Sequence, residues 1–250
     1  MKKFKNALIF TLSVLPIAGV AAYFTILYQM EFMDAATLEI ALEQIGGKTA
    51  LIVVYIVQIL VYAAFCGFVG HILAEKLGLM KPIRFEKREL LHTLVLSLVA
   101  GVVLALDYWT FGAWIPGVRE ADEAMLSWNV IASCVLYGGV MEELMMRLFL
   151  MSLLAWLCWK LFLRKRETVP TGVVIAANVI TALLFAAGHL PATFQMFGTL
   201  TPLILFRCFL LNGGFGLVFG WLYRKYGIQY SMLSHALTHI VSKTIWLILI

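Results

Sequence analysis

The chain has 250 residues, of which 62% are hydrophobic and only 13% are charged, and its formal net charge is +5. Soluble domains are about half apolar and a quarter charged, so this composition excludes a soluble globular protein and indicates a polytopic membrane protein with the lipid bilayer as its first partner. Nucleic acid is not an expected partner, because no basic run interleaved with aromatic residues is long enough to follow a phosphate backbone.

Seven apolar stretches are long enough to cross the hydrocarbon core, which takes about 20 residues in a helix. In chain order they are residues 7–29, 50–73, 90–106, 126–163, 172–190, 202–223 and 229–250. The first stretch follows basic residues and imitates a signal peptide, but its apolar run continues to Tyr28, so we expect an uncleaved span. The sequence therefore predicts an all-α transmembrane helical bundle that forms a single membrane domain over 1–250.

The loops between these stretches alternate in charge. Acidic residues dominate the first and third loops, whereas basic residues mark the N-terminus and every second loop, at positions 2–5, 76–88, 164–166 and 224–225. Because basic loops stay in the cytoplasm, the pattern predicts a multi-pass protein of the cell membrane with a cytoplasmic N-terminus. Splitting 126–163 into two helices would break the alternation, so we expect one long helix there, with a flexible point at Gly138-Gly139.

Charged residues interrupt the fourth stretch. The segment VMEELMMRLFL, residues 140–150, contains Glu142, Glu143 and Arg147. A charge in hydrocarbon costs at least about 2.5–3.5 kcal/mol on insertion scales, so such residues indicate a functional site unless they only tie helices together. Glu143 and Arg147 are four residues apart with the acid first, which favours an ion pair along one helix face. Glu142 is left without a local partner.

Histidines recur in the fifth and seventh stretches. Phe185 and His189 are four apart near the end of the fifth, where the two rings can pack together. His235 and His239 are four apart in the seventh, and Lys243 continues the same helix face. A single histidine at a helix end is commonly an interface residue, but two at this spacing can bind one metal ion or one oxygen of a substrate.

These groups predict a polar cavity between the fourth, fifth and seventh helices. In such a cavity Glu142 would act as general base on a water molecule, while imidazoles would share the proton and donate to a developing oxyanion. The set is suited to hydrolysis of an amide bond, and it lacks the HExxH arrangement of zinc proteases. A proton-coupled transporter is an alternative of another class, although no inverted repeat or pair of broken helices supports it.

Three ordered motifs carry a resemblance to a known family. They are Glu142-Glu143-x-x-x-Arg147, Phe185-x-x-x-His189 and His235-x-x-x-His239, and the glycines of NGGFGLVFGWLY precede the last of them. Together they resemble the CAAX-protease and bacteriocin-processing family, also called Abi, which includes the type II CAAX prenyl endopeptidases. The resemblance covers a motif-bearing core over 125–250 and leaves 1–124 as accessory spans.

The resemblance implies an intramembrane endopeptidase that cleaves a peptide or membrane-protein substrate with a glutamate-activated water. Carried over by position, Glu142 is the base, His189 is its partner and His235 is an oxyanion donor. The supporting positions are Glu143, Arg147 and Phe185. A non-proteolytic relative, acting in bacteriocin immunity or as a membrane partner protein, would share the fold without the chemistry.

Two positions depart from the family pattern. His239 stands where Asn or Asp is usual, and Leu148 stands where Gly commonly follows the arginine. His239 can donate to an oxyanion only from a protonated nitrogen. It also opens an alternative in which His189, His235 and His239 bind zinc, which favours imidazole ligands. We expect the glutamic mechanism, without a cofactor.

The depth of His235 conflicts with straight, upright helices. Counted from the turn near Glu167, Glu142 and His189 both lie about 33–37 Å along their helices. His235 lies only about 12 Å beyond the turn at Gly227. Strong tilt, a dip before the seventh helix, or a hairpin of the fourth and fifth helices that projects into the cytoplasm would each bring the three residues level.

Overall fold

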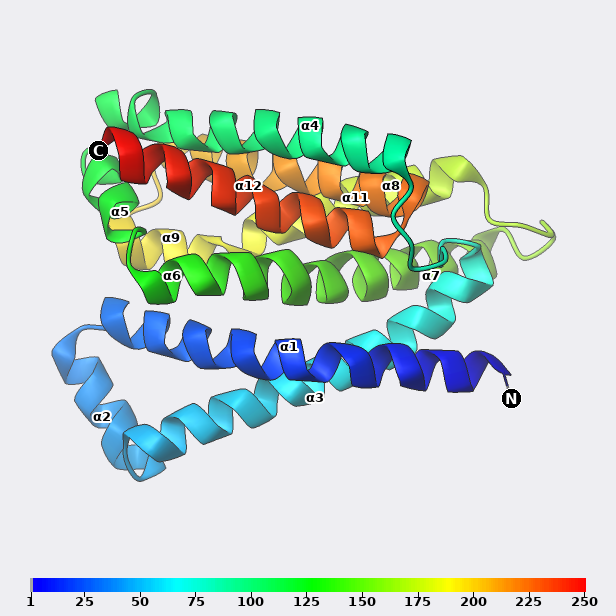
Figure 1. Cartoon of the computed structure of the whole chain (residues 1–250), viewed down its shortest axis with the longest axis horizontal. Coiled ribbons are helices and arrows are strands. Elements are labelled where there is room, and N and C mark those ends of the chain that lie inside the picture. Colours follow the sequence, from blue (N-terminus) through cyan, green and yellow to red (C-terminus); the bar gives the residue numbers. More distant parts are fainter. Residues whose placement is uncertain (1) are drawn as a thin grey trace.

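The computed structural model describes residues 2–250, with side chains from Lys3 onward, so the side chain of Lys2 among the basic N-terminal residues lies outside the described part. Within 2–250 the chain is helical and has no strand (Figure 1). Its elements are α1 Lys2–Phe32, α2 Ala35–Ile45, α3 Lys48–Leu77, α4 Lys87–Ala105, η1 Leu106–Tyr108, η2 Phe111–Ala113, α5 Val118–Ala124, α6 Trp128–Ser133, η3 Cys134–Glu142, η4 Leu144–Met151, α7 Ser152–Phe162, α8 Thr171–Gly188, α9 Leu190–Phe197, α10 Pro202–Cys208, η5 Phe209–Gly213, α11 Gly214–Tyr226 and α12 Ile228–Leu249. The elements η1 and η2 are short 3-10 helices, and η3, η4 and η5 are π-helices.

Seven continuous helical segments are long and apolar enough to cross a membrane, and they confirm the predicted seven-span bundle. They are Lys3–Phe32, Lys48–Leu77, Lys87–Ala113, Trp128–Phe162, Thr171–Phe197, Pro202–Tyr226 and Ile228–Leu249. The fourth is a single segment of 35 residues, as the loop charges predicted. Its two glycines lie inside the π-wound segment η3, and Figure 1 shows a continuous helix at that point rather than a sharp bend.

The long fourth span lies between two pairs of helices. On one side α12 packs against η3 and against α4, and on the other side α1 packs against η3, α6 and α3 (Figure 1). Glycines permit the closest approaches, because a Cβ added at Gly139 would lie 2.7 Å from the Cβ of Ala236 on α12. A Cβ at Gly70 of α3 would lie 3.0 Å from the Leu148 backbone, so the glycine of this contact is on α3 rather than after Arg147.

The helical hairpin of the fourth and fifth spans projects beyond its neighbours, and this removes the conflict in depth. Ser152 Oγ lies 2.8 Å from Tyr223 Oη, so the start of α7 is level with the last turn of α11. The 11 residues of α7 extend about 16 Å beyond that point, past the turn at Gly227, and Figure 1 shows the following loop farther out still. Measured from Ser152 rather than from the loop, Glu142 and His235 are at similar depth.

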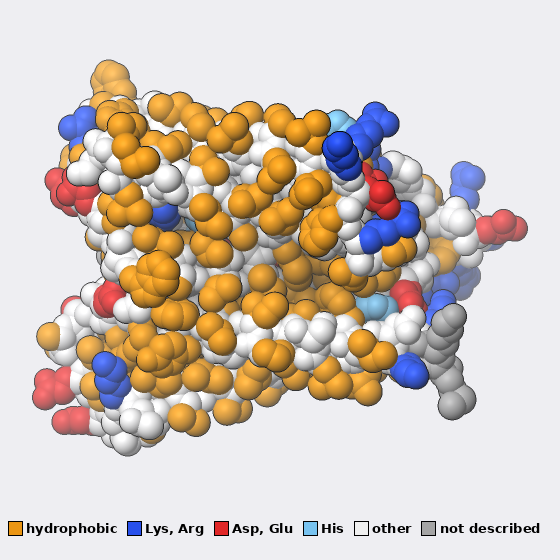
Figure 2. Space-filling view, in the orientation of Figure 1, with side chains coloured by type: hydrophobic (Ala, Val, Ile, Leu, Met, Phe, Trp, Pro, Cys, Tyr) orange, Lys and Arg blue, Asp and Glu red, His pale blue; other side chains and the backbone are white. Residues whose placement is uncertain are grey.

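The surface separates apolar and charged side chains along the long axis of the bundle. Figure 2 shows hydrophobic side chains covering the middle of the visible face, with Lys and Arg side chains concentrated at the end where α1 begins and the loop after α7 projects. Acidic side chains are more frequent at the opposite end. A wide apolar belt between charged ends is the surface expected of a protein surrounded by lipid.

Candidate active site

The ion pair predicted from the spacing of Glu143 and Arg147 is present and buried. Arg147 Nη1 lies 3.1 Å from Glu143 Oε1, and the two side chains are 1% and 0% exposed. The angle of this approach is not that of a hydrogen bond, since Nη1 has no hydrogen-bond partner among the described residues. Nη2 donates to the Gly216 carbonyl at 3.1 Å, and the guanidinium lies 4.7 Å from the centroid of the Phe185 ring. The cation is thus enclosed by a carboxylate, a carbonyl and an aromatic face.

His235 connects the two glutamates. Its Nδ1 lies 2.8 Å from Glu143 Oε1, and because an ionised carboxylate only accepts, Nδ1 donates its hydrogen. Its Nε2 then faces Glu142, whose Oε2 is 3.9 Å away. The ring is stacked on Phe219 with 4.5 Å between centroids and 17° between planes. The buried glutamate and the aromatic face together fix the orientation of the imidazole toward Glu142.

The two consecutive glutamates have different surroundings. The side chain of Glu143 is fully buried, whereas that of Glu142 is 21% exposed. Close by, a Cβ added at Gly138 would lie 3.4 Å from Nε2 of His235 and 3.4 Å from Nε2 of His239. The absence of a side chain at Gly138 therefore lets both ring nitrogens lie close to the η3 backbone.

His189 lies at the junction of α8 and α9. Its Nδ1 is 2.8 Å from the Phe185 carbonyl oxygen, and because that oxygen can only accept, Nδ1 donates and the neutral ring keeps a lone pair on Nε2. The predicted packing of the two rings is present, with 4.7 Å between centroids. The ring of Phe185 also faces the ring of His235 edge-on, with 6.1 Å between their centroids, and this contact joins the second motif to the third. Within 2–250, no hydrogen bond or ion pair joins His189 to Glu142.

A small cavity of about 50 Å³ lies beside the two histidines of α12. The residues that line it are Leu104, Phe185, Leu211, Asn212, Phe215, Phe219, His235, Thr238 and His239. The fifth and seventh helices contribute as predicted, and the third and sixth helices line it as well, whereas no residue of the fourth helix does. Glu142 of the fourth helix adjoins it through His235, and η3 and α12 are in close contact at Gly139 and Ala236.

Several residues of this site were missed from the sequence. The hydroxyl of Ser231 lies within hydrogen-bond distance of Glu143 Oε2 and of the Phe219 carbonyl, and its single proton serves one of them at a time. Its position four residues before His235 was a usable signal, because it continues the same helix face. Gly216 was noted only as part of a glycine pattern, yet a Cβ there would lie 3.0 Å from Arg147 Nη2.

The side chains do not assemble a metal site in this arrangement. Among residues 2–250 there is no group of three or more His, Cys, Asp or Glu side chains placed to hold a metal ion. Because the donor set does not fit zinc here, no step of the chemistry below is assigned to a metal.

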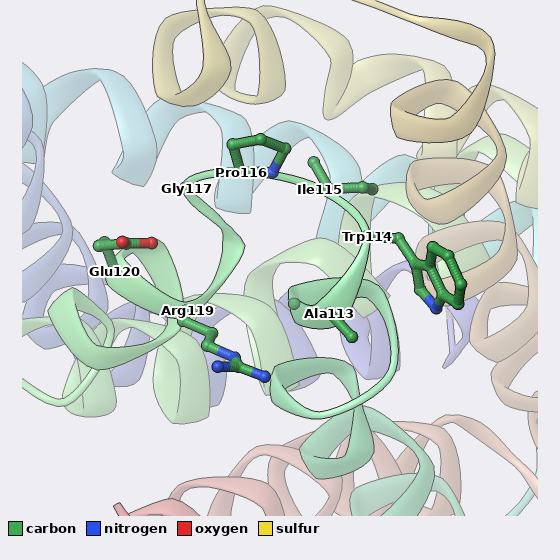
Figure 3. Close-up of a pocket in the computed structure, with 8 residues that line it drawn as sticks. Ala113, Trp114, Ile115, Pro116, Gly117, Arg119 and Glu120 are labelled. Carbon is green, nitrogen blue, oxygen red and sulfur yellow. The ribbon is translucent and has the colours of Figure 1, made fainter.

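A larger hollow of about 280 Å³ lies far along the chain from these motifs, at residues 112–120. It shares no residue with the cavity beside His235. Figure 3 shows that the side chains of Trp114, Arg119 and Glu120 point in different directions and do not converge on a common ligand. Trp114 is 80% exposed, which suits an anchor at the membrane–water interface.

The comparisons with known proteins agree with the motif order. A family model described as type II CAAX prenyl endopeptidase Rce1-like matches residues 124–241. The matched range contains all three motifs, from Glu142 to His239, and leaves α1 to α4 outside it. No curated protein and no solved structure matches the chain.

Proposed function

We propose that this chain, which belongs through residues 124–241 to the CAAX-protease and bacteriocin-processing family, is an intramembrane endopeptidase in which Glu142 activates the attacking water. The family supports a membrane-embedded protease acting on a protein or peptide substrate. The glutamic mechanism rests on the side chains themselves. Glu142 is the more exposed of the two adjacent carboxylates, and it adjoins an imidazole nitrogen.

In the proposed reaction, Glu142 takes a proton from a water molecule as the water oxygen attacks the carbonyl carbon of the scissile amide. The resulting oxyanion occupies the cavity lined by His235 and His239, where Nε2 of His235 and Nε2 of His239 donate to it when they carry hydrogen. The C–N bond then breaks as the proton held by Glu142 passes to the leaving nitrogen. The products are a new carboxyl terminus and a new amino terminus. We assign His189 as the partner of Glu142 by its place in the family motif.

Glu143 and Arg147 act through His235 rather than on the substrate. The carboxylate accepts from Nδ1 and holds the ring with Nε2 directed toward Glu142. Arg147 offsets the cost of burying that carboxylate, which the bilayer would otherwise make prohibitive. The pair is therefore a support that holds one oxyanion donor in place.

The observation that carries the proposal is a cavity lined by His235 and His239 whose His235 Nε2 lies 3.9 Å from a partly exposed carboxylate, Glu142. Neither a proton relay nor a structural charge cluster requires two histidines to line one cavity. We also infer that the N-terminus is cytoplasmic, because the basic side chains concentrate at the end of the bundle where α1 begins (Figure 2).

The test is the comparison of membrane proteomes from cells that contain the wild-type protein or Glu142→Gln. The amide keeps the size of the carboxylate and loses its basicity, and removing a general base lowers rates by about 10²–10⁴-fold. New protein termini should appear with the wild type and disappear with the variant. Glu75→Gln is the matched control, since Glu75 is another partly buried glutamate of a membrane helix. Identical termini with and without the Glu142 carboxylate would show that the chain is a non-proteolytic relative or uses another base.

A further inference from the structure

Lys243 is a buried cation beside the candidate active site. It follows His235 and His239 on the same face of α12, and its side chain is 5% exposed. Its Nζ lies 4.1 Å from the centroid of the Trp246 ring. Within the described part of the chain it forms no hydrogen bond and no ion pair. The aromatic face attracts the charge but does not replace an acceptor for its three N–H groups.

Two carboxylates of the same region, Asp107 and Asp122, contact Arg207 rather than Lys243. Nε of Arg207 donates to Asp107 Oδ1 and Oδ2 at 2.9 and 3.0 Å, and its Nη2 lies 3.6 Å from Asp122 Oδ1. Burial and the neighbouring Asp107 raise the pKa of Asp122 to about 7, against the opposing effect of Arg207 and Lys243. Arg207 contacts both carboxylates, whereas Lys243 forms an ion pair with neither of them. The uncompensated positive charge is at Lys243.

An ammonium group buried without a counter-ion costs several kcal/mol, and such groups in membrane proteins mark the path of a substrate or an ion. The position of Lys243 makes the substrate the relevant partner. Residues four apart on a helix have Cβ atoms about 5–6 Å apart, and an extended peptide advances about 3.3 Å per residue. A peptide bond held at His239 therefore places groups about two residues away within reach of Lys243.

We propose that Lys243 is a substrate-binding residue that pairs with a carboxylate located within about two residues of the scissile bond. The carboxylate comes from an Asp or Glu side chain or from the C-terminus of the substrate. The pairing supplies the counter-ion that Lys243 lacks in the free protein, and it selects acidic segments among those that reach the site. This proposal rests on the protease function proposed above.

The first experiment needs no substitution at Lys243. Sites cleaved in membrane proteomes by the wild type and not by Glu142→Gln should carry an acidic side chain or a chain end within two residues of the cut. Four synthetic peptides copied from one such site then separate the side-chain carboxylate from the C-terminal carboxylate. Two peptides keep the acidic side chain and two carry its amide, and each kind is made with a free and with an amidated C-terminus. The matching carboxylate should raise kcat/KM about tenfold, and the pair of peptides that shows the effect identifies the source.

Substitution then assigns the effect to Lys243. Lys243→Met should bring the carboxylate-to-amide ratio of kcat/KM close to one, and Lys243→Glu should favour a peptide with Lys at the recognised position. Lys160→Met is the control, because Lys160 also lies over a tryptophan, 4.2 Å from the Trp159 ring centroid, but at an exposed helix end. It should keep the wild-type ratio.

The outcomes separate the two proposals. Equal kcat/KM of the wild type for carboxylate and amide peptides overturns the role of Lys243 and leaves the protease function intact, whether or not the variants fold. A carboxylate preference that Lys243→Met retains also overturns it. If the wild type and Glu142→Gln yield the same termini, the protease function fails, and the subsite fails with it.

Discussion

Two adjacent glycines of η3 allow the helix contact and the open site to be tested separately with the same substitution. A Cβ at Gly139 would lie 2.7 Å from the Cβ of Ala236 and 3.0 Å from its Cα, so Gly139→Ala must move η3 away from α12. A Cβ at Gly138 would lie 3.4 Å from Nε2 of His235 and of His239, which is an ordinary contact distance. Gly138→Ala therefore places a methyl group against the two imidazoles without moving a helix.

The difference in stability between these two variants isolates the steric effect. Each alanine gains about 1 kcal/mol of helix propensity over glycine, and this gain cancels in the comparison. Overpacking at a tight contact costs about 1–3 kcal/mol, so Gly139→Ala should be less stable than Gly138→Ala by about that amount. For a chain of this size the thermal unfolding midpoint in detergent should differ by at least about 2–4 °C.

For Gly138→Ala, cleavage activity should fall although stability does not. Gly138→Ala should fold like the wild type and yet lose most of its cleavage of the same proteome sites, because its methyl group lies against the two ring nitrogens assigned to the oxyanion. Gly139→Ala should lose stability and activity together. Equal midpoints for the two variants would refute the close contact of η3 with α12, and full activity of Gly138→Ala would refute the position of the oxyanion.

Three further substitutions test the charges around the site. Arg147→Ala leaves Glu143 buried without its cation, so the variant should lose about 3–5 kcal/mol of stability and much of its folded yield, measured by size-exclusion chromatography in detergent; unchanged yield would mean that the pair contributes nothing. The pKa of Asp122 is raised to about 7 by burial and by Asp107, so the folded state holds a proton that the unfolded chain releases near pH 4, and stability should fall by up to about 4 kcal/mol as pH rises from 4 to 7. Asp122→Asn should flatten the fall of the unfolding midpoint between pH 4 and 7, and an unchanged pH profile would contradict the raised pKa. His239→Asn restores the usual residue of the family and should keep activity within about tenfold; one zinc per chain in the wild type, lost together with activity in this variant, would favour the metal mechanism instead.

The spans could be predicted from the sequence because the bilayer imposes a simple physical requirement. A helix of about 20 apolar residues satisfies all its backbone hydrogen bonds in hydrocarbon, and alternating loop charges then identified 126–163 as one helix. The ion pair of Glu143 and Arg147 was also predictable, since it depends only on residues four apart in one helix. Local spacing was sufficient for each of these features.

The cavity could not be predicted in the same way, because it depends on which helices approach most closely. The sequence identified Gly138 and Gly139 as small residues but did not reveal that one faces Ala236 and the other faces two imidazoles. The change from α to π winding over Cys134–Glu142 sets those directions. A π-helix has more residues per turn than an α-helix, so face assignments based on 3.6 residues per turn no longer hold there.

The pairing of two consecutive glutamates has a physical basis in the opposite environments that they need. A carboxylate that orients His235 must be buried and paired, and Glu143 is held by Nδ1 of that ring and by Arg147 with no exposure to water. A carboxylate that activates water must be accessible and must keep its basicity, which excludes a tight ion pair with arginine. One side chain cannot meet both conditions. Neighbouring positions on a helix point in different directions, so the sequence Glu142-Glu143 places one carboxylate in each environment while both remain close to the same imidazole.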